Sequence, residues 1–330
     1  MTIKIAINGF GRIGRLVARA AIEAEGVEVV SINDLAPIET NAHLFKYDSV
    51  HGKFKGEVSV EGDAIVVNGQ KIRVTSERDP AALPHDVVGA DYVIESTGIF
   101  TKKSDAAKHI KGGVKRVIIS APSGDADYMV VLGVNCEGIP ADAKVISNAS
   151  CTTNCLAPMV KALNDKYGVV KGLVTTIHSY TNDQSVLDVF HKDQRRARAA
   201  AVNQIPSSTG AAKAIGKVIP ALNGKLDGLA IRVPTPNVSL VDFVAHINAE
   251  PTKEDVNATL KAAASAGSLA PYLNYTEELL VSSDFNHDPA SCTIDAQSTF
   301  VLGNMVKVLG WYDNEWGYSN RCIDLVKILG

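Results

Sequence analysis

The chain has 330 residues, enough for about two domains, and its 46% hydrophobic and 21% charged residues are typical of a globular protein. The formal net charge of -3 provides no field that would hold a polyanion, so nucleic acid is not an expected partner. No apolar run approaches the roughly 20 residues that a membrane span requires, and the N-terminal segment lacks the pattern of a secretory signal. We therefore expect a cytoplasmic protein that does not bind a membrane.

The cysteines favour a reducing compartment. They are odd in number, contain no Cys-x-x-Cys pair and are too sparse to crosslink a chain of this size. We expect free thiols, one of them a candidate for reactivity, and no metal site. The five are Cys136, Cys151, Cys155, Cys292 and Cys322.

The first half of the chain has the pattern of an α/β domain. An alternating β-branched segment at 3–7 is followed by a glycine-containing turn, a helical pattern and an apolar strand at 27–32, which together form a βαβ unit. Turn signals predict hairpins inserted at 58–75. Further apolar strands at 91–95 and 116–120, with a helical pattern between them, predict that the parallel sheet resumes.

The pattern changes near residue 150. A helix is predicted from Cys151 to about residue 166, and helices are predicted at 211–218, 252–264 and 319–329. Long alternating segments predict a second sheet that is mixed or largely antiparallel. These segments lie at 173–177, 229–233, 238–247, 291–301 and 305–312.

Three glycines, Gly9, Gly11 and Gly14, follow the first predicted strand and open the first predicted helix. In this context they allow a tight turn and a close approach to a pyrophosphate, to which the helix N-terminus offers free N–H groups. Asp34 lies 20 residues after Gly14, at a strand end where a carboxylate accepts hydrogen bonds from ribose hydroxyls. Its charge would repel the 2'-phosphate of NADP, so the pattern favours NAD. The alternative is an ordinary glycine turn beside a solvated acid.

Cys151 stands at the start of a predicted helix, directly after the polar run 147–150. A helix N-terminus favours the thiolate, which is the nucleophilic form of cysteine. A structural cysteine is an equally weighted alternative at this point, because free cysteines are usually buried. Cys155 lies one helical turn further on, and we expect it to pack as a small apolar residue.

His178 ends the predicted strand 173–177 where the chain enters a polar run, so it is the candidate general base. A hydrogen-bonded core histidine is the alternative for any single histidine. His51 and His191 lie in polar segments and stay open. We assign the core role to His43, His85, His109, His246 and His287.

Several residues are suited to binding a phosphate. Arg196 lies in a polar loop, Arg232 ends a strand, and the polar run 207–210 precedes a helical segment. Guanidinium groups, hydroxyls and the N–H groups of a helix start all bind oxyanions. For the neighbouring Arg195 and Arg198 we expect a subunit contact or a solvated face.

Motifs spread over the whole chain strengthen these assignments. They are INGFGRIGR at 7–15, IND at 32–34, KYDSVHGKF at 46–54, SNASCTTNCLAP at 147–158, HSYTNDQ at 178–184, RRARAAA at 195–201, PSSTGAAKA at 206–214, RVPTPNVS at 232–239 and WYDNEWGYS at 311–319. In this combination the sequence resembles the phosphorylating glyceraldehyde-3-phosphate dehydrogenase family.

The resemblance implies a fold and a reaction. The expected fold is a Rossmann-type dinucleotide-binding domain at 1–150 and an α+β catalytic domain at 151–315 with a mixed, largely antiparallel sheet. A last helix at 316–330 would pack back on the first domain. The expected enzyme is a homotetramer that oxidises D-glyceraldehyde 3-phosphate with NAD and inorganic phosphate to 1,3-bisphosphoglycerate. Cys151 would form a thioester, with His178 as its base.

The resemblance also implies the binding residues. The residues expected to contact NAD are Gly9, Gly11, Arg12, Ile13, Gly14, Asp34, Arg78, Ser120 and Asn314, the last of which would hold the nicotinamide amide. Ser120 stands where many relatives have threonine, a change that keeps the hydroxyl. The residues expected around the substrate's C3 phosphate are Thr181, Asp183, Arg196 and Arg232, and those for inorganic phosphate are Ser150, Thr152, Thr209 and Gly210.

One departure and three rival functions remain. Val189 and Phe190 stand where many NAD-specific relatives have leucine and proline, which bears on the choice between NAD and NADP. The chain also resembles erythrose-4-phosphate dehydrogenase at 284–289, although Thr181 and the run 208–210 argue against that enzyme. A semialdehyde dehydrogenase would need a carboxylate clamp instead of two anion sites. A catalytically silent binding protein would not need the cysteine and histidine pair.

Overall fold

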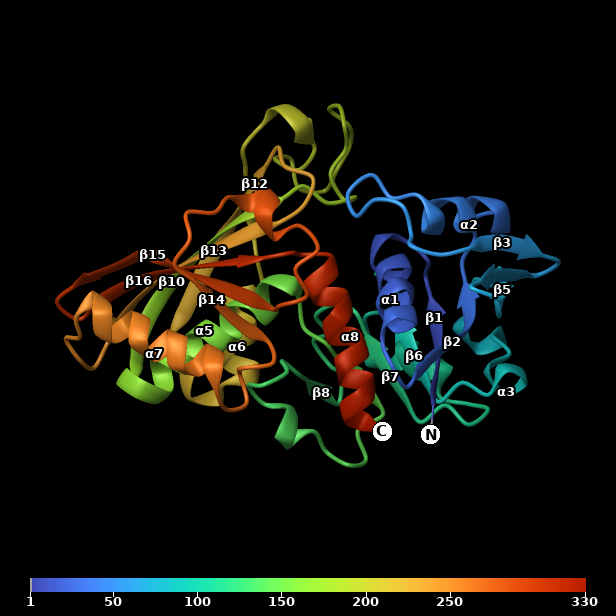
Figure 1. Cartoon of the computed structure of the whole chain (residues 1–330), viewed down its shortest axis with the longest axis horizontal. Coiled ribbons are helices and arrows are strands. Elements are labelled where there is room, and N and C mark those ends of the chain that lie inside the picture. The colour runs from blue at the N-terminus through green and yellow to red at the C-terminus, as the bar shows by residue number, and fades with distance from the viewer. Residues whose placement is uncertain (1) are drawn as a thin grey trace. The chain divides into compact units, whose positions relative to one another are not determined.

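The computed structural model describes residues 2–330, and the chain divides into two compact units (Figure 1). The first consists of the chain up to Val130 together with Gly138–Ala149 and Ser319–Gly330. The second consists of Val131–Glu137 and Ser150–Tyr318. The predicted domain ranges, which break at 150 and 316, stay a prediction of domain organisation.

The first unit contains a nine-stranded sheet. Its strands are β1 (Ile3–Asn8), β2 (Val27–Asn33), β3 (Val58–Glu61), β4 (Ala64–Val67), β5 (Gln70–Thr75), β6 (Tyr92–Glu95), β7 (Arg116–Ile119), β8 (Tyr128–Met129) and β9 (Val145–Ser147). The order is β3-β4-β5-β2-β1-β6-β7-β9-β8. All neighbours from β5 onward pair in parallel, whereas β3, β4 and β5 pair antiparallel, as expected for the predicted hairpins.

Parallel pairing explains why the strands of the first unit are apolar on both faces. Ile5, Val93 and Val117 are fully buried at the centre of β1, β6 and β7. Parallel strands need crossovers, which explains the intervening helices. These are α1 (Arg12–Glu23), α2 (Ile38–Lys46), α3 (His85–Val88) and α4 (Lys103–Ala106). The helical pattern predicted between the strands at 91–95 and 116–120 forms only the short helix α4, because the chain continues as a 3-10 turn at Ala107–His109.

The second unit contains a seven-stranded sheet that is mixed. Its strands are β10 (Val169–Ser179), β11 (Ile205–Ser208), β12 (Leu226–Val233), β13 (Ser239–Ile247), β14 (Leu273–Thr276), β15 (Cys292–Leu302) and β16 (Met305–Tyr312). The pairs β10 with β12 and β14 with β15 are parallel, and the remaining pairs are antiparallel. This arrangement agrees with the mixed, largely antiparallel sheet that the alternating segments predict.

Three helices pack on this second sheet: α5 (Cys151–Tyr167), α6 (Ala211–Val218) and α7 (Lys253–Ser265). The helix α5 lies along the second sheet (Figure 1) and contacts β10, β13, β15 and β16. Its apolar residues from Cys155 to Leu163 are all buried. The helix α7 begins with the capping box that the sequence predicts, in which Thr252 and Asp255 bond each other's backbone N–H groups.

The last helix, α8 (Trp316–Leu329), belongs to the first unit from Ser319 onward. The hydroxyl of Tyr92 on β6 fastens its end by donating to the carbonyl of Leu329 at 2.9 Å. Over residues 2–330, no helix has both the length and the apolar character needed to cross a bilayer.

Candidate active site

Cys151 is the first residue of α5, and a sharp backbone turn places it there. Ala149 has a φ of 54°, in the left-handed region that residues other than glycine rarely adopt. Ser150 then caps the helix, because its Oγ accepts a hydrogen bond from the N–H of Thr153 at 3.1 Å. The thiol is thus held at the predicted helix start, and it keeps some exposure to solvent.

His178 lies near the end of β10, within reach of this thiol. Its Nε2 is 3.6 Å from the Sγ of Cys151. Its Nδ1 is 2.7 Å from the carbonyl oxygen of Ser179, and donation of Nδ1–H to that oxygen leaves Nε2 free to accept a proton. A thiol beside an oriented imidazole is the arrangement of nucleophilic catalysis, which favours this role for Cys151 over a structural one.

Burial disfavours both a thiolate on Cys151 alone and an imidazolium on His178 alone. It raises the pKa of the Cys151 thiol, which the guanidinium of Arg232 opposes. Burial and Arg232 together lower the pKa of His178 to about 3. Transfer of the proton from Sγ to Nε2 creates both charges at once, at a distance where their attraction offsets the desolvation. We therefore expect a thiolate here to depend on the imidazole beside it.

The structure joins the residues predicted for the substrate phosphate into one hydrogen-bonded cluster. Nη1 of Arg232 donates to the carbonyl oxygen of Ser179 at 3.1 Å and to the Oγ1 of Thr181 at 3.2 Å. The Thr181 hydroxyl donates in turn to the carboxylate of Asp183. Arg196 completes the cluster through its Nη1, which donates to Asp183 at 2.5 Å.

Within this cluster Asp183 differs from its neighbours in charge. Burial opposes its ionisation, but the hydrogen bond from Thr181 and the charges of Arg196 and Arg232 lower its pKa. An ionised carboxylate repels a phosphate, so Asp183 is suited to holding the two arginines in place. The guanidinium groups and the Thr181 hydroxyl are the donors that an anion would use.

Two hydroxyls predicted to bind inorganic phosphate are engaged inside the protein. The Ser150 hydroxyl caps α5 and lies 2.7 Å from the Oγ1 of Thr153. Thr152 is buried, and its Oγ1 lies 2.9 Å from the hydroxyl of Tyr312. The backbone N–H groups at the start of α5 are therefore better placed to meet an anion than these two side chains.

Thr209 and Gly210 lie at the start of α6, as the sequence predicts. Gly210 is the cap residue, and nothing lies within 4 Å of the position that a Cβ would take. The Oγ1 of Thr209 accepts a hydrogen bond from the N–H of Ala211 at 3.2 Å. This helix start is open, and the exposed Lys213 adds a positive charge in its first turn.

The residues predicted to bind the cofactor in the first unit follow the carboxyl ends of its parallel strands. Gly9 has a φ of 89°, and a Cβ on it would lie 2.6 Å from the backbone N of Thr97. A Cβ on Gly14 would lie 2.0 Å from the carbonyl oxygen of Gly9. Only glycine fits at these two positions, and at Gly11 the backbone is open to an incoming group.

The remaining cofactor candidates of this unit lie at the same sheet edge. Asp34 accepts hydrogen bonds from the N–H groups of Phe10 at 2.7 Å and Ala36 at 2.9 Å, which ties it to the glycine turn. Ser120 follows β7, and Arg78 lies in an exposed loop after β5. The helix α1 has no side-chain cap, so its first N–H groups suit a pyrophosphate. Arg12 pairs with Asp48, and Ile13 lies beside it in the first turn.

Asn314 belongs to the second unit, where a serine orients its amide. Ser239 Oγ donates to the Oδ1 of Asn314 at 2.8 Å, while the N–H of Ser179 donates to Ser239 Oγ at 3.1 Å. The amide nitrogen of Asn314 therefore points away from Ser239. A fixed amide of this kind is suited to recognising another amide.

Comparison with known proteins identifies the family. The family model described as the glyceraldehyde 3-phosphate dehydrogenase NAD binding domain matches residues 3–103, and the corresponding C-terminal domain matches residues 150–314. The chain belongs to the glyceraldehyde-3-phosphate dehydrogenase family. It is 60% identical to glyceraldehyde-3-phosphate dehydrogenase of Priestia megaterium over 100% of this chain and 98% of the relative. It is 63% identical to glyceraldehyde-3-phosphate dehydrogenase 1 of Bacillus cereus over 98% and 97% of the two chains.

Membership of the glyceraldehyde-3-phosphate dehydrogenase family confirms the resemblance and the fold class. A third relative, from Geobacillus stearothermophilus, is 58% identical over 98% of this chain and 97% of its own length, and it carries the same family name. Agreement over the full length disfavours erythrose-4-phosphate dehydrogenase, which the segment 284–289 had suggested.

The histidines outside the pair behave less uniformly than predicted. His85 and His109 are buried and hydrogen-bonded, which confirms their core role. The same prediction is wrong for His43 and His287, which are exposed. His287 stacks on Trp316 with ring centroids 3.9 Å apart, so it is held by an aromatic contact instead of by burial.

Sequence reasoning missed a hydroxyl network behind the pair. The Tyr312 hydroxyl lies 2.9 Å from the Oγ1 of both Thr152 and Thr176, and its ring meets that of His178 edge-on with centroids 6.0 Å apart. Burial raises the pKa of Tyr312 well above its usual value, so it stays protonated. The alternation of β16 predicts that Tyr312 faces inward, but not that it meets α5.

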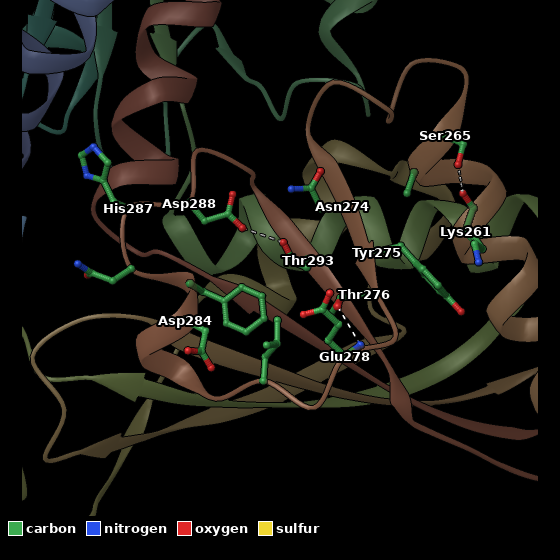
Figure 2. A pocket seen from close by; sticks show the side chains of 14 residues that line it. Lys261, Ser265, Asn274, Tyr275, Thr276, Glu278, Asp284, His287, Asp288 and Thr293 are labelled. Carbon is green, nitrogen blue, oxygen red and sulfur yellow. Dashed lines mark hydrogen bonds between the residues drawn. The ribbon is translucent and has the colours of Figure 1, made fainter.

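A second hollow in the same unit is unrelated to this site. A cavity of about 680 Å³ is lined by residues of α7, β14 and the segment before β15 (Figure 2). Two of its charged groups are engaged locally: Asp288 accepts a hydrogen bond from Thr293 at 3.0 Å, and Lys261 pairs with Glu277 at 2.8 Å. Neither Cys151 nor His178 lines it.

Proposed function

We propose that this chain oxidises D-glyceraldehyde 3-phosphate to 1,3-bisphosphoglycerate, with a covalent thioester on Cys151 as the intermediate. Family membership makes it an NAD-dependent oxidoreductase. The observation that supports the covalent route is the distance of 3.6 Å between the Sγ of Cys151 and the Nε2 of His178 at a helix N-terminus.

The first step joins the thiolate sulfur of Cys151 to the aldehyde carbon. The proton that the Nε2 of His178 took from the thiol passes to the oxygen of this adduct, which gives a hemithioacetal hydroxyl. As hydride leaves the carbon, the hydroxyl returns this proton to Nε2, which the bond between Nδ1 and the carbonyl of Ser179 keeps available. The N–H of Cys151 at the start of α5 stabilises the oxygen on which negative charge develops. When bound, NAD supplies the acceptor for the hydride that leaves the same carbon.

The second step releases the product from Cys151. Inorganic phosphate attacks the thioester carbon, the carbon–sulfur bond breaks, and the thiolate is regenerated. We assign the incoming phosphate to the starts of α5 and α6, with Ser150, Thr152, Thr209 and Gly210. Thr181, Arg196 and Arg232 hold the substrate's own phosphate, with Asp183 keeping the arginines in place, and so orient the aldehyde toward sulfur.

The assay that tests this function measures NADH formation with glyceraldehyde 3-phosphate and erythrose 4-phosphate, each with and without inorganic phosphate. We expect sustained turnover only with glyceraldehyde 3-phosphate and phosphate together. Faster turnover of erythrose 4-phosphate, or turnover that is independent of phosphate, would refute the proposal.

Asp34 is expected to set the preference for NAD. Its loss removes two hydrogen bonds to the ribose and the repulsion of a 2'-phosphate, so Asp34→Gly should lower kcat/KM for NAD by about 10- to 100-fold and raise it for NADP. Asp34→Asn is the comparison variant, because it keeps the shape, removes the charge and replaces one of the two oxygens that accept from Phe10 and Ala36. A kcat/KM for NADP equal to that for NAD in the unmodified protein would contradict this prediction. It would implicate the loop of Val189 and Phe190, whose Phe190 side chain is 94% exposed.

We assign the enzyme to a cytoplasmic homotetramer. Its free cysteines suit a reducing compartment. Two groups of exposed apolar side chains in the second unit support self-association, since single chains rarely expose such patches. One lies in the loop after β10 and the other on the sheet; they comprise Val186, Leu187, Val189, Phe190, Leu173, Leu229, Phe300 and Leu302.

Sedimentation of the unmodified protein tests this assembly. We expect a single species with about four times the chain mass of 35.0 kDa. Phe190→Asp should shift the distribution toward smaller species, because it places a charge in an apolar interface. Sedimentation of the unmodified protein as one chain would contradict the assignment.

A further inference from the structure

The first unit holds a cluster of polar side chains in its core, at the carboxyl edge of the parallel sheet. Asn8, Asn33, Glu95 and His109 are all at least nine-tenths buried. None of their side-chain nitrogen or oxygen atoms lacks a hydrogen-bond partner. Burying an ionisable group stabilises the fold less than burying an apolar side chain of similar size. A buried cluster in which every polar atom is hydrogen-bonded therefore indicates a role besides packing.

Glu95 is the centre of this cluster. Its Oε1 accepts hydrogen bonds from the N–H of Thr97, at 2.9 Å, and from the Thr97 hydroxyl. Its Oε2 accepts from the amide of Asn8 at 2.6 Å and from the Nε2 of His109 at 3.0 Å. Four donors around one carboxyl group match its ionised form, which has no proton of its own to place.

The cluster extends from Glu95 to the neighbouring strands. The Asn8 carbonyl accepts from the amide of Asn33 at 2.7 Å. Asn33 in turn bonds both backbone groups of Glu77, at 2.8 and 2.9 Å. On the other side, His109 Nδ1 lies 3.1 Å from the Nε2 of His85, whose pKa burial and His109 lower to about 4. His85 is thus neutral at physiological pH.

Three residues of this network precede a predicted cofactor residue in the chain. Asn8 precedes Gly9, Asn33 precedes Asp34, and Glu77 precedes Arg78. Thr97, which Glu95 holds, lies against the backbone of Gly9, where a Cβ would approach to 2.6 Å. The neighbouring Ser96 hydroxyl donates to the carbonyl of Gly9 at 2.7 Å.

We propose that Glu95 is a positioning residue for NAD: its buried carboxylate fixes the glycine turn, the Asp34 strand end and the Thr97 loop relative to one another. The inference rests on NAD binding at this sheet edge, and it adds residues that do not touch the cofactor. Replacing the Glu95 carboxylate by an amide leaves the amide donor of Asn8 facing another donor, which loosens the glycine turn. Cys151 and His178 lie in the other unit, so this change does not alter their contacts.

The test is a double-mutant cycle. In Glu95→Gln the amide oxygen still accepts from Thr97, but the amide nitrogen meets the Asn8 nitrogen. Adding Asn8→Asp restores the pairing, because the new carboxylate accepts from the introduced amide and from Asn33. The Nε2 of His109 lies 3.4 Å from the replaced nitrogen, so it is also within reach of the new carboxylate. Val117→Ala is the control for stability alone, because Val117 is buried in the same unit and takes no part in the cluster.

The readouts are the Kd of NAD by equilibrium dialysis of the nucleotide-free chain, the Tm, and the kcat at saturating NAD. We expect Glu95→Gln to raise the Kd by about 10-fold or more and to leave kcat within about threefold. The double variant should recover most of the affinity. Val117→Ala should lower the Tm without changing the Kd.

Three results would overturn the proposal. They are an unchanged Kd in Glu95→Gln, a Kd that Asn8→Asp does not restore, and a Kd that rises equally in Val117→Ala. If Glu95→Gln does not fold, Thr97→Val decides. It removes the hydroxyl that donates to Glu95 and accepts from the N–H of Ile99, but it leaves the backbone donor of Thr97 to Glu95 in place. An unchanged Kd in Thr97→Val refutes the proposal. Binding of NAD is measured without aldehyde, so a failure of the proposed reaction is seen separately.

Discussion

Replacing Cys151 by serine is expected to lower kcat by about a thousandfold or more while leaving the Kd of NAD unchanged. A serine hydroxyl next to His178 lacks the thiolate character that makes the sulfur nucleophilic. The helix start and its Ser150 cap do not depend on the sulfur, so the fold should be retained.

Cys155→Ser is the matched control for this substitution. Cys155 is fully buried one turn further along α5, and its Sγ donates weakly to the carbonyl of Gly310 at 3.5 Å. A serine hydroxyl can make the same bond, so we expect a change in kcat of less than about threefold. Loss of activity in Cys155→Ser with retention in Cys151→Ser would show that the nucleophile is assigned to the wrong cysteine.

His178→Asn is expected to lower kcat by about 10²- to 10⁴-fold, the usual contribution of a positioned general base. It should also move the pH profile of Cys151 alkylation by iodoacetamide. Burial raises the pKa of the isolated thiol, so without the imidazole the thiolate forms only at higher pH and alkylation near neutral pH becomes slower. Arg232 remains in the variant and opposes part of this shift.

The direction of the pH shift separates two accounts of the pair. If the imidazole sustains the thiolate, the unmodified protein reacts readily near neutral pH and His178→Asn requires a more alkaline solution. An identical alkylation profile in both proteins, together with unchanged turnover, would mean that Cys151 and His178 do not act together.

Local signals in the sequence were sufficient for much of the site. Gly9, Gly14 and Asp34 follow a spacing that backbone geometry imposes, and the helix start at Cys151 follows from the capping residue before it. His178 could be placed at a strand end, but its distance from Cys151 depends on the packing of α5 against β10. Periodicity does not determine that packing.

Contacts between distant parts of the chain could not be predicted. Asn8 and Glu95 are 87 positions apart and meet only because β1 and β6 pair in parallel. The hydroxyl of Thr152 meets Tyr312 across 160 positions, so its engagement inside the protein was invisible in the local motif. For residues that act through such long-range contacts, the only indication in the sequence is a polar side chain at an unusual place in an apolar strand.

The short strands were missed for a related reason. Strands β8, β9, β11 and β14 span two to four residues, too few for a period of two to stand out from a loop. The long strands β1 and β13 could be predicted, and so could the four-residue strands β6 and β7, because their apolar pattern extends over almost the whole buried segment.

The covalent intermediate can be observed directly. The unmodified enzyme is mixed with NAD and glyceraldehyde 3-phosphate in the absence of inorganic phosphate, quenched in acid, digested and examined by mass spectrometry. We predict a burst of about one NADH per chain and a 3-phosphoglyceroyl group on the peptide that contains Cys151, with the label on Cys151 itself and its loss on addition of phosphate. A burst without an acyl adduct, or an adduct on Cys155, would contradict the covalent route.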